Sequence, residues 1–435
     1  MVAGWPLKFL LLGFPLWWVL GLSTFIFPIM AIPMAWQLWK RGAVRLPPAF
    51  WLWAVFLVWQ FVSLVMFDAN PTGTHAGSTS NRILSLAVSY VLYAGITVTL
   101  LYVANLPISA VPQAAVARWM GAFFLTVAAG GFLGMLYPRL SFPSLVELVL
   151  PHRLTESAYV RVLVHPVASQ VQAVLGTESG RPAAPFSYTN DWAAAIGILL
   201  VWYVAAFVLP LRGRRSLVPL GVAAASLVPI VVSLNRGLWI ALVFIGVWLT
   251  VRQLAQRRIR VLLTGVAVLV AALAIIGLTP LRSIIEQRLH NGTSDNIRSF
   301  VAARSITAIE HSPILGYGGN RHTDGSYQSI AVGPTVECST CGDVPTGSTG
   351  QLWAVMFNQG ITGVIAYFGF FGASLWIYRR ERGAINEAAL ATIALVFVYM
   401  WFYLAVPAAP TLTMVAVGVL DRARQARVET RQQGG

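Results

Sequence analysis

Apolar segments of about twenty residues, the length that spans a bilayer as a helix, recur from one end of the chain to the other. Of the 435 residues 57% are hydrophobic and only 10% are charged, and the mean hydropathy is +0.70. A water-soluble domain of this length does not have that balance, which excludes a soluble enzyme or a nucleic-acid-binding protein. The sequence therefore predicts an all-α, polytopic helical membrane protein with a single integral membrane domain over residues 1–435.

The segments that we expect to cross the membrane number about twelve by length and hydropathy. The first two share one apolar run that is broken by Gly21, Pro28 and Pro33. No small-residue cleavage site follows the N-terminal segment, so we interpret it as an uncleaved span. The predicted spans are 9–21, 23–39, 48–67, 84–105, 117–136, 192–210, 216–234, 237–251, 261–278, 351–378, 386–405 and 408–420.

The charges of the connecting loops predict the orientation of these spans. The net charge of +15 is unevenly divided, because one set of loops carries 19 Lys and Arg against 4 acids and the other carries 11 against 11. Loops rich in Lys and Arg stay in the cytoplasm. Both termini are then cytoplasmic, and the two long connections, 137–191 and 279–350, are extracytoplasmic loops of a protein of the cytoplasmic membrane.

All six histidines are predicted to lie on the extracytoplasmic side, five of them in the two long loops. In the first loop, residues 144–151 and 158–175 are too short or too interrupted to span, and we expect interfacial amphipathic helices. In the second loop, residues 295–311 are expected to be helical and SPILGYGG at 312–319 to form a turn. The six histidines are His75, His152, His165, His290, His311 and His322.

A single arginine, Arg236, interrupts an otherwise uncharged run from Ser216 to Val251. A charge in such a run is costly unless it reaches water or a partner. The topology puts Arg236 at a short outer turn, beside Asn235, which is a candidate N-cap of the next helix. Asn190 is likewise expected to cap the span that follows it. Arg236 is either a functional ligand or an interfacial anchor.

The only two cysteines, Cys338 and Cys341, form the motif ECSTC in the second extracytoplasmic loop. An oxidising compartment favours a small local disulfide between them. A zinc site would need two further ligands, and a thioredoxin-like role would need a βαβ context, which is missing. Two free thiols are the remaining alternative, and no motif in the chain calls for a metal or an organic cofactor.

Four segments resemble, in order and spacing, the O-antigen ligase and polymerase superfamily of membrane glycosyltransferases. They are RPAAPFSYTNDWAAAIG at 181–197, SLNRGLWIAL at 233–242, NIRSFVAARSITAIEHSPILGYGG at 296–319 and GSTGQLWAVMFNQGITG at 347–363. The resemblance covers about 180–365, and its motifs are degenerate. It implies a GT-C-like helical fold and transfer of a polyprenyl-diphosphate-linked glycan to an acceptor hydroxyl on a glycan or glycolipid, outside the cytoplasmic membrane.

The resemblance also implies which arginines hold the donor diphosphate. Arg236 and Arg298 match the arginines of the superfamily, and Arg304 and Arg181 are weaker candidates. Arg298 and Arg304 are six residues apart and therefore point in different directions from one helix. A guanidinium suits this role, because it stays charged, binds phosphate oxygens in pairs and stabilises charge on a leaving diphosphate. A solvated helix face or a loop anchor is the alternative for each.

One position departs from the superfamily pattern. Its ligases carry a histidine eleven residues before a glycine that corresponds to Gly360, and here that position is Thr349. A threonine hydroxyl does not accept a proton near neutral pH as an imidazole does. Thr349 is then either an acceptor contact or a helix N-cap. His322 is a candidate base, with an ordinary surface histidine as the alternative.

Two other functions fit the same sequence. A flippase for a lipid-linked glycan would suit twelve spans, but intramembrane charges are nearly absent and no repeated pair of broken helices is visible. A non-catalytic scaffold would keep the fold and not need Arg236. The leading prediction is a membrane ligase or polymerase of the cell envelope. The sequence does not distinguish a ligase from a polymerase.

Overall fold

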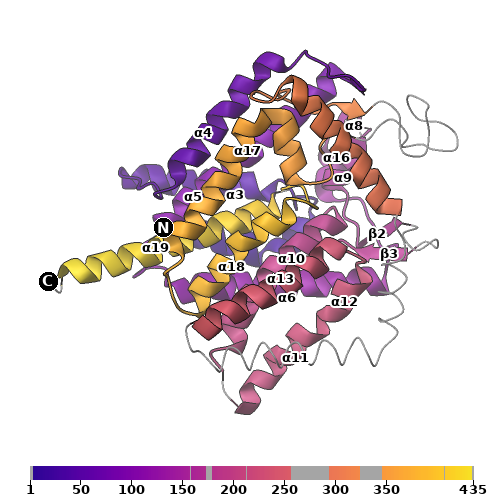
Figure 1. Cartoon of the computed structure of the whole chain (residues 1–435). Helices are drawn as coiled ribbons and strands as arrows, with labels where there is room; N and C mark the ends of the chain where they lie inside the picture. Colours follow the sequence, from indigo (N-terminus) through magenta and orange to yellow (C-terminus); the bar gives the residue numbers. More distant parts are fainter. Residues whose placement is uncertain are drawn as a thin grey trace.

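The computed structural model describes residues 3–156, 158–172, 179–211, 213–255, 293–323, 345–405 and 407–433. Helices dominate and pack into one bundle (Figure 1). The helices before the first long loop are α1 (Trp5–Leu12), α2 (Phe14–Val19), α3 (Ile26–Arg41), α4 (Phe50–Val62), α5 (Thr79–Ala104) and α6 (Gln113–Leu136). Those from that loop to the second are α7 (Leu145–Val149), α8 (His152–Thr155), α9 (Ala158–Val164), α10 (Thr189–Tyr203), α11 (Leu217–Ala225), α12 (Leu227–Val232) and α13 (Arg236–Ala255). The remaining helices are α16 (Thr293–His311), α17 (Gln351–Tyr378), α18 (Ala384–Tyr399) and α19 (Ala408–Gln433).

Each predicted span that the structure describes contains helix over most of its length. The span 261–278 lies outside the described residues. Within the described ranges, six helical segments are long and apolar enough to cross a membrane, and two shorter apolar helices accompany them. A polytopic membrane protein is thereby supported, while the total of twelve spans and the GT-C-like architecture stay predictions. The six segments are Thr79–Ala104, Gln113–Leu136, Thr189–Val208, Gly213–Val232, Arg236–Ala255 and Gln351–Tyr378.

Three predicted spans are less regular than expected. The first divides at Gly13 into α1 and α2, because Pro15 lacks the N–H that would continue the helix. The seventh divides at Ser226 into α11 and α12, with Pro229 in the first turn of α12. The span predicted at 386–405 is helical only to Tyr399, and its last residues form part of the loop between α18 and α19.

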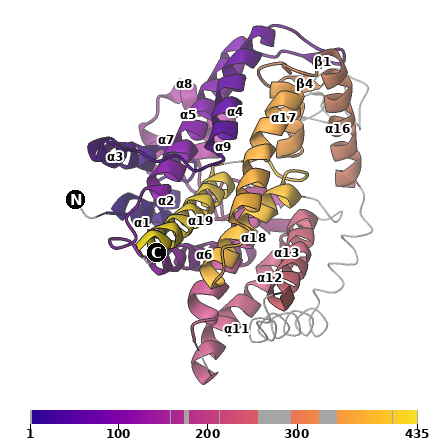
Figure 2. The same cartoon turned by 60° about the vertical axis from the view of Figure 1, so that its left-hand side comes forward.

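The fold is not purely α-helical, since two short antiparallel ribbons join the loops. The predicted interfacial helix 158–175 ends at Val164, before Pro166, and the chain then forms β2 (Ser169–Gln172). This strand pairs with β3 (Ser179–Pro182), with Gln170 opposite Arg181. A second ribbon pairs β1 (Thr74–His75) with β4 (His322–Thr323). The expected helix at 295–311 and the turn after it are confirmed, and α16 lies beside α17 (Figure 2).

The two sets of loops predicted from charge occupy opposite ends of the bundle. At one end the turn after α2 contacts α7, through a hydrogen bond from Val146 N to Leu20 O of 3.2 Å, and β1 pairs with β4. At the other end Arg422 bonds to Val111 O and Arg427 pairs with Glu381. Helices α13 and α17 each run from the first end to the second. The loop charges therefore correspond to a real spatial division.

Gly360 kinks α17 and lets a loop dock there. Its φ of 67° and ψ of −169° are not helical, and the kink frees backbone groups of α17. Tyr317 N and Gly318 N donate to Phe357 O and Asn358 O at 2.9 and 2.8 Å, and Ile361 N donates to Pro313 O at 2.7 Å. The backbone groups that the kink frees in α17 thus form hydrogen bonds with residues 313–318.

We expect Gly360→Ala to lower the stability by roughly 2–3 kcal/mol, because a left-handed backbone conformation is strained for alanine and the docked loop leaves no room. The added Cβ would lie 2.4 Å from Ile314 O. The apparent Tm of the purified protein in detergent measures the effect. Gly369→Ala is the matched control in the same helix, since its Cβ meets only Leu52 methyl carbons at 3.7 Å. Equal Tm values for the two variants would contradict the prediction.

Candidate functional site

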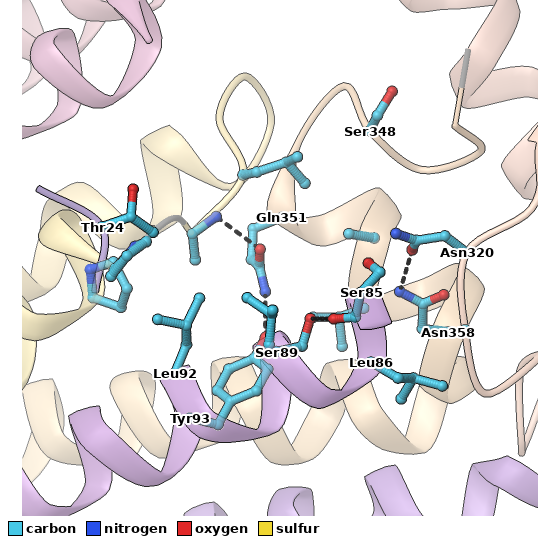
Figure 3. A pocket seen from close by; sticks show the side chains of 18 of the residues that line it. Thr24, Ser85, Leu86, Ser89, Leu92, Tyr93, Asn320, Ser348, Gln351 and Asn358 are labelled. Atoms are coloured by element: carbon cyan, nitrogen blue, oxygen red, sulfur yellow. Dashed lines mark hydrogen bonds between the residues drawn. The ribbon is translucent and has the colours of Figure 1, made fainter. Parts of the chain in front are cut away.

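A cavity of about 580 Å³ lies at the end of the bundle where the long loops meet, between α5, α17 and residues 318–320 (Figure 3). Helix α5 presents polar side chains to it at helical spacing, from Arg82 through Ser85 and Ser89 to Tyr93. Helix α17 contributes Gln351, Asn358 and others to the opposite wall. The cavity thus combines an apolar lining with many hydrogen-bonding groups, as ligand sites do.

Gln351 holds three parts of the cavity wall together. Its side-chain Nε2 donates to the Tyr93 hydroxyl at 3.1 Å, and its Oε1 accepts from Ala405 N at 2.8 Å (Figure 3). Its backbone N donates to Tyr403 O at 2.8 Å. The first turn of α17 is therefore fixed both to α5 and to the loop after α18.

Other amide groups line the cavity with unused hydrogen-bonding capacity. Asn358 Nδ2 donates to Asn320 Oδ1 at 3.2 Å, while Asn358 Oδ1 is buried and has no partner among the described residues. Gln60 Nε2 is likewise buried and has no partner among the described residues. Buried polar atoms are normally hydrogen-bonded, so a polar ligand in the cavity would satisfy these two. Amides that both donate and accept suit sugar hydroxyls.

Arg181 is the one predicted diphosphate ligand that lines this cavity among the residues described. It lies on β3, and its Nε donates to Ser233 O at 2.8 Å. Thr189, at the start of α10, donates its hydroxyl to Arg181 O at 3.2 Å. These contacts tie the β2–β3 ribbon to the start of α10 and to the turn before α13.

Arg298 reaches the same region from α16. Its Nη1 donates to Phe402 O at 3.1 Å, so it lies beside Tyr403. The Tyr403 hydroxyl donates to Asn235 Oδ1, and Asn235 Nδ2 donates to Asn190 Oδ1 at 2.9 Å. Arg298 is thereby joined to the start of α10 and of α13 through two side chains.

Arg236 is the first residue of α13 and lies at the same place. Leu234, with a φ of 54°, turns the chain sharply before it. Gly237 packs so closely that a Cβ there would lie 2.9 Å from the Tyr403 hydroxyl. Arg181 and Arg298 thus bond to Ser233 O and Phe402 O, and the start of α13 at Arg236 and Gly237 packs against residues 402–403. We call Arg181, Arg236 and Arg298 the cationic cluster. Asn235 precedes α13 as predicted, but Asn190 lies inside α10, whose N-cap is Tyr188, so its predicted capping role is wrong.

The charges of this cluster act on Tyr403, which lies in the loop beyond α18. Burial and the neighbouring Tyr399 raise the pKa of the Tyr403 hydroxyl well above its usual value, and the charges of Arg298 and Arg181 lower it. Both guanidinium groups are thus close to one buried hydroxyl. Such a concentration of positive charge in a partly dry site favours the binding of an anion.

The other predicted site residues lie elsewhere. Arg304 points to residues 71–75, where a Cβ on Gly73 would lie 2.8 Å from its Nη1, and its guanidinium stacks on Phe300. His322 is on β4, and its ring stacks on His75 with 5.5 Å between centroids. Neither residue lines the cavity among the described residues.

Thr349 lies beside the cavity, between Ser348 and Gln351, both of which line it. It does not cap α17, because the N-cap is Gly350 and no side chain bonds there. The Thr349 Oγ1 atom is buried and has no partner in the described part of the chain. The position where the superfamily ligases have a histidine is thus near the cavity, although the threonine is not a base.

Two residues that the sequence did not single out shape the site. Asp191, in the first turn of α10, lines the cavity together with Arg181. It is the one carboxylate among the described lining residues. The available signal was its place in SYTNDW, directly before a span, where an acid at a helix N-terminus is also expected for electrostatic reasons alone.

Arg321 is the second such residue and organises the cavity rim. Its side chain is fully buried and donates to Asn70 Oδ1 at 2.9 Å, Gly319 O at 2.9 Å and Ala69 O at 2.8 Å. Burial lowers its pKa to about 10, so it stays protonated at neutral pH. These bonds fasten residues 66–70 to residues 317–321, which include the cavity-lining Gly318, Gly319 and Asn320.

The predicted disulfide pair, Cys338 and Cys341, lies outside the described residues, as does His290. Within the described ranges no group of three or more His, Cys, Asp or Glu side chains is placed to hold a metal ion. The cationic cluster and the cavity are therefore the features on which a function is argued.

Comparison with known proteins identifies the central part of the chain. Residues 220–337 match the family described as O-Antigen ligase. The matched stretch includes Arg236 and Arg298, while its residues 256–292 and 324–337 lie outside the described structure. No curated protein and no solved structure matches the chain. The match contains two of the four segments that resemble the superfamily, 233–242 and 296–319, and it supports the resemblance of the chain to the O-antigen ligase family.

Proposed function

We propose that this membrane protein transfers a polyprenyl-diphosphate-linked glycan to an acceptor hydroxyl at the outer face of the cytoplasmic membrane. The O-antigen ligase domain supports a membrane ligase or polymerase role in general. The observation that carries the finer proposal is that Arg181 lines a polar cavity, while Arg298 and the start of α13 at Arg236 both lie at residues 402–403 nearby.

The three arginines are proposed to bind the donor diphosphate. A planar guanidinium stays charged at neutral pH and presents its N–H donors in a fixed geometry that matches phosphate oxygens. Charge grows on the diphosphate as the sugar leaves, and fixed cations stabilise that charge most in the transition state.

The cavity is proposed to hold the acceptor sugar. Asn320, Asn358, Gln60 and Gln351 offer amide groups around it, and Tyr93 adds an aromatic hydroxyl. Two of these amides have atoms that a sugar hydroxyl would satisfy. Because Arg181 belongs to both the cavity lining and the cationic cluster, an acceptor bound here would lie next to the donor diphosphate.

Asp191 is proposed as the general base. The acceptor oxygen forms a bond to the anomeric carbon of the donor sugar while the bond from that carbon to the diphosphate oxygen breaks. The acceptor proton passes to the Asp191 carboxylate, and the electron pair of the broken bond leaves on the diphosphate. Asp191 thus supplies the proton acceptor that Thr349 cannot supply.

The division of charge supports the proposed outer location of the site. The loops at the cavity end are balanced in charge, whereas those at the other end hold most of the excess of arginine. Positively charged loops tend to stay in the cytoplasm, which favours an extracytoplasmic cavity end. Donor glycans carried on the outer leaflet would then have direct access to the cationic cluster.

Deletion of the gene tests the proposal as a whole. We expect the deletion strain to accumulate diphosphate-linked glycan at the outer leaflet and to lose a matching envelope glycan, with both restored by the wild-type chain. Lipid extraction combined with labelling of outer-leaflet glycans on intact cells measures this. Accumulation at the inner leaflet would instead make the protein a flippase.

A further inference from the structure

A second cavity, of about 680 Å³, lies at the opposite end of the bundle from the proposed transfer site. Helix α13 begins at Arg236 in the transfer site and reaches this second cavity at Arg252 and Ala255. Twenty helical residues rise by about 30 Å, the thickness of the hydrocarbon core. We name it the basic pocket, lined by Arg252, Ala255, Arg379, Arg380, Glu381, Arg382 and Arg427.

The positive charge of the basic pocket is only partly neutralised. Arg252 forms a two-bond ion pair with the buried Glu387, with Nε–Oε2 and Nη2–Oε1 distances of 2.6 and 3.1 Å. Arg427 pairs with the buried Glu381. Each buried acid thus has one arginine of the pocket, and these pairs fix α13 to α18 and α19 to the loop after α17.

Three further arginines remain beyond these two pairs. Arg379 donates to Trp376 O and its guanidinium lies 3.7 Å from the centroid of the Trp376 ring. Arg380 and Arg382 are exposed, and no acid lies within ion-pairing distance of them in the described part of the chain. Like charges gathered in a concave site repel one another, and a bound anion removes that repulsion.

The surroundings of the basic pocket are those of a lipid-facing surface. Val251 and Leu254 of α13 and Trp376 of α17 are all exposed, the tryptophan by 67%. Tryptophan at a helix end beside arginines is typical of the boundary between acyl chains and headgroups. A ligand with an anionic head and apolar tails would therefore meet arginines and apolar side chains in the right order.

From these observations we infer that the basic pocket binds a phosphate-bearing anion, and that the source is the phosphodiester headgroup of an anionic glycerophospholipid of the inner leaflet. Arg379, Arg380 and Arg382 would bind the phosphate oxygens, and the acyl chains would lie along the exposed residues of α13 and α17. This inference does not depend on the transfer reaction. A soluble phosphate compound is the other source with the same chemistry.

The test uses the full-length protein in mild detergent and compares two matched double variants. Arg380→Gln/Arg382→Gln removes two exposed arginines from the pocket. Arg214→Gln/Arg215→Gln removes two arginines from another loop at the same end, which does not line the pocket. The pocket variant and the control variant therefore lose equal charge on the same predicted side, and Tm values equal to that of the wild type confirm that both fold.

Binding is measured by native mass spectrometry with phosphatidylglycerol. Phosphatidylcholine, which is zwitterionic and has no net charge, is the comparison lipid, and inorganic pyrophosphate is the soluble probe. We expect wild type and the Arg214/Arg215 variant to retain phosphatidylglycerol, and the Arg380/Arg382 variant to bind it on the order of tenfold more weakly, since each arginine near a headgroup contributes to affinity. Phosphatidylcholine should not be retained.

Two results would overturn the inference as a whole, and a third would overturn only the lipid as the source of the anion. Equal loss of phosphatidylglycerol in both double variants would mean that general surface charge, and not the pocket, holds the lipid. Failure of the wild type to retain either probe would mean that the pocket binds no phosphate. Retention of pyrophosphate without phosphatidylglycerol, with the same dependence on Arg380 and Arg382, would keep the anion site and overturn the lipid as its source.

Discussion

Asp191→Asn is expected to reduce glycan transfer by about 10²–10⁴-fold, the contribution of a positioned general base. The amide keeps the size of the side chain and its place at the start of α10, so donor binding should stay close to normal. The loss should appear in kcat rather than KM. An assay with purified protein, a synthetic polyprenyl-diphosphate glycan and an acceptor glycan measures it.

Glu310→Gln is the control for Asp191→Asn. Glu310 is an exposed acid near the end of α16, and it does not line the cavity in the described structure. Removing its charge should leave kcat unchanged. The base assignment and glycan transfer are tested separately. Activity retained by Asp191→Asn would refute only the base assignment, because the phenotype of the deletion strain tests glycan transfer itself. A raised acceptor KM with normal kcat would make Asp191 a binding residue instead.

Arg298→Ala is expected to lower kcat/KM by about 10²–10³-fold, as removal of one donor to a developing anion does. Arg298 bonds to Phe402 O and lies beside Tyr403, so its loss also removes a charge from the cluster with Arg181. Arg298→Lys should recover only part of the rate, because an ammonium keeps the charge but not the paired geometry. The same purified assay measures both variants.

Arg304→Ala is the matched control on the same helix. Its guanidinium stacks on Phe300 and lies near Gly73, away from the cationic cluster. If Arg304→Ala is as inactive as Arg298→Ala, a general requirement for α16 and its charge explains the loss, and the diphosphate role of Arg298 is refuted. In cells, Arg298→Ala should reproduce the accumulation of donor glycan that we expect in the deletion strain.

The membrane class and the division of the loops could be predicted from the sequence, for a physical reason. In hydrocarbon every backbone N–H and C=O needs an internal partner, so a long apolar run has to be helical. The loop charges then divide the connections into two sets, and the structure groups each set at its own end of the bundle. Arg236 was detectable because a lone charge in a 36-residue uncharged run, from Ser216 to Val251, needs an explanation.

Local breaks in the helices were harder to predict. Pro15 and Pro229 divide two of the expected spans, and a predicted interfacial helix gives way to β2 after Pro166. Proline marks such places in the sequence, but whether the chain then bends, stops or forms a strand depends on what lies opposite. For β2 that is β3, which follows later in the same loop.

The site itself was decided by the tertiary structure. Arg298 and Phe402 are 104 residues apart, and Arg181 and Ser233 are 52 apart, so no local pattern specifies either contact. In the sequence, Asp191 is recognisable only as an acid at the start of a helix, and it is the packing of the helices that places it in the cavity. Hydropathy determines which segments enter the membrane, because that depends on each segment alone; which side chains meet depends on how the helices pack, and that is a property of the whole chain.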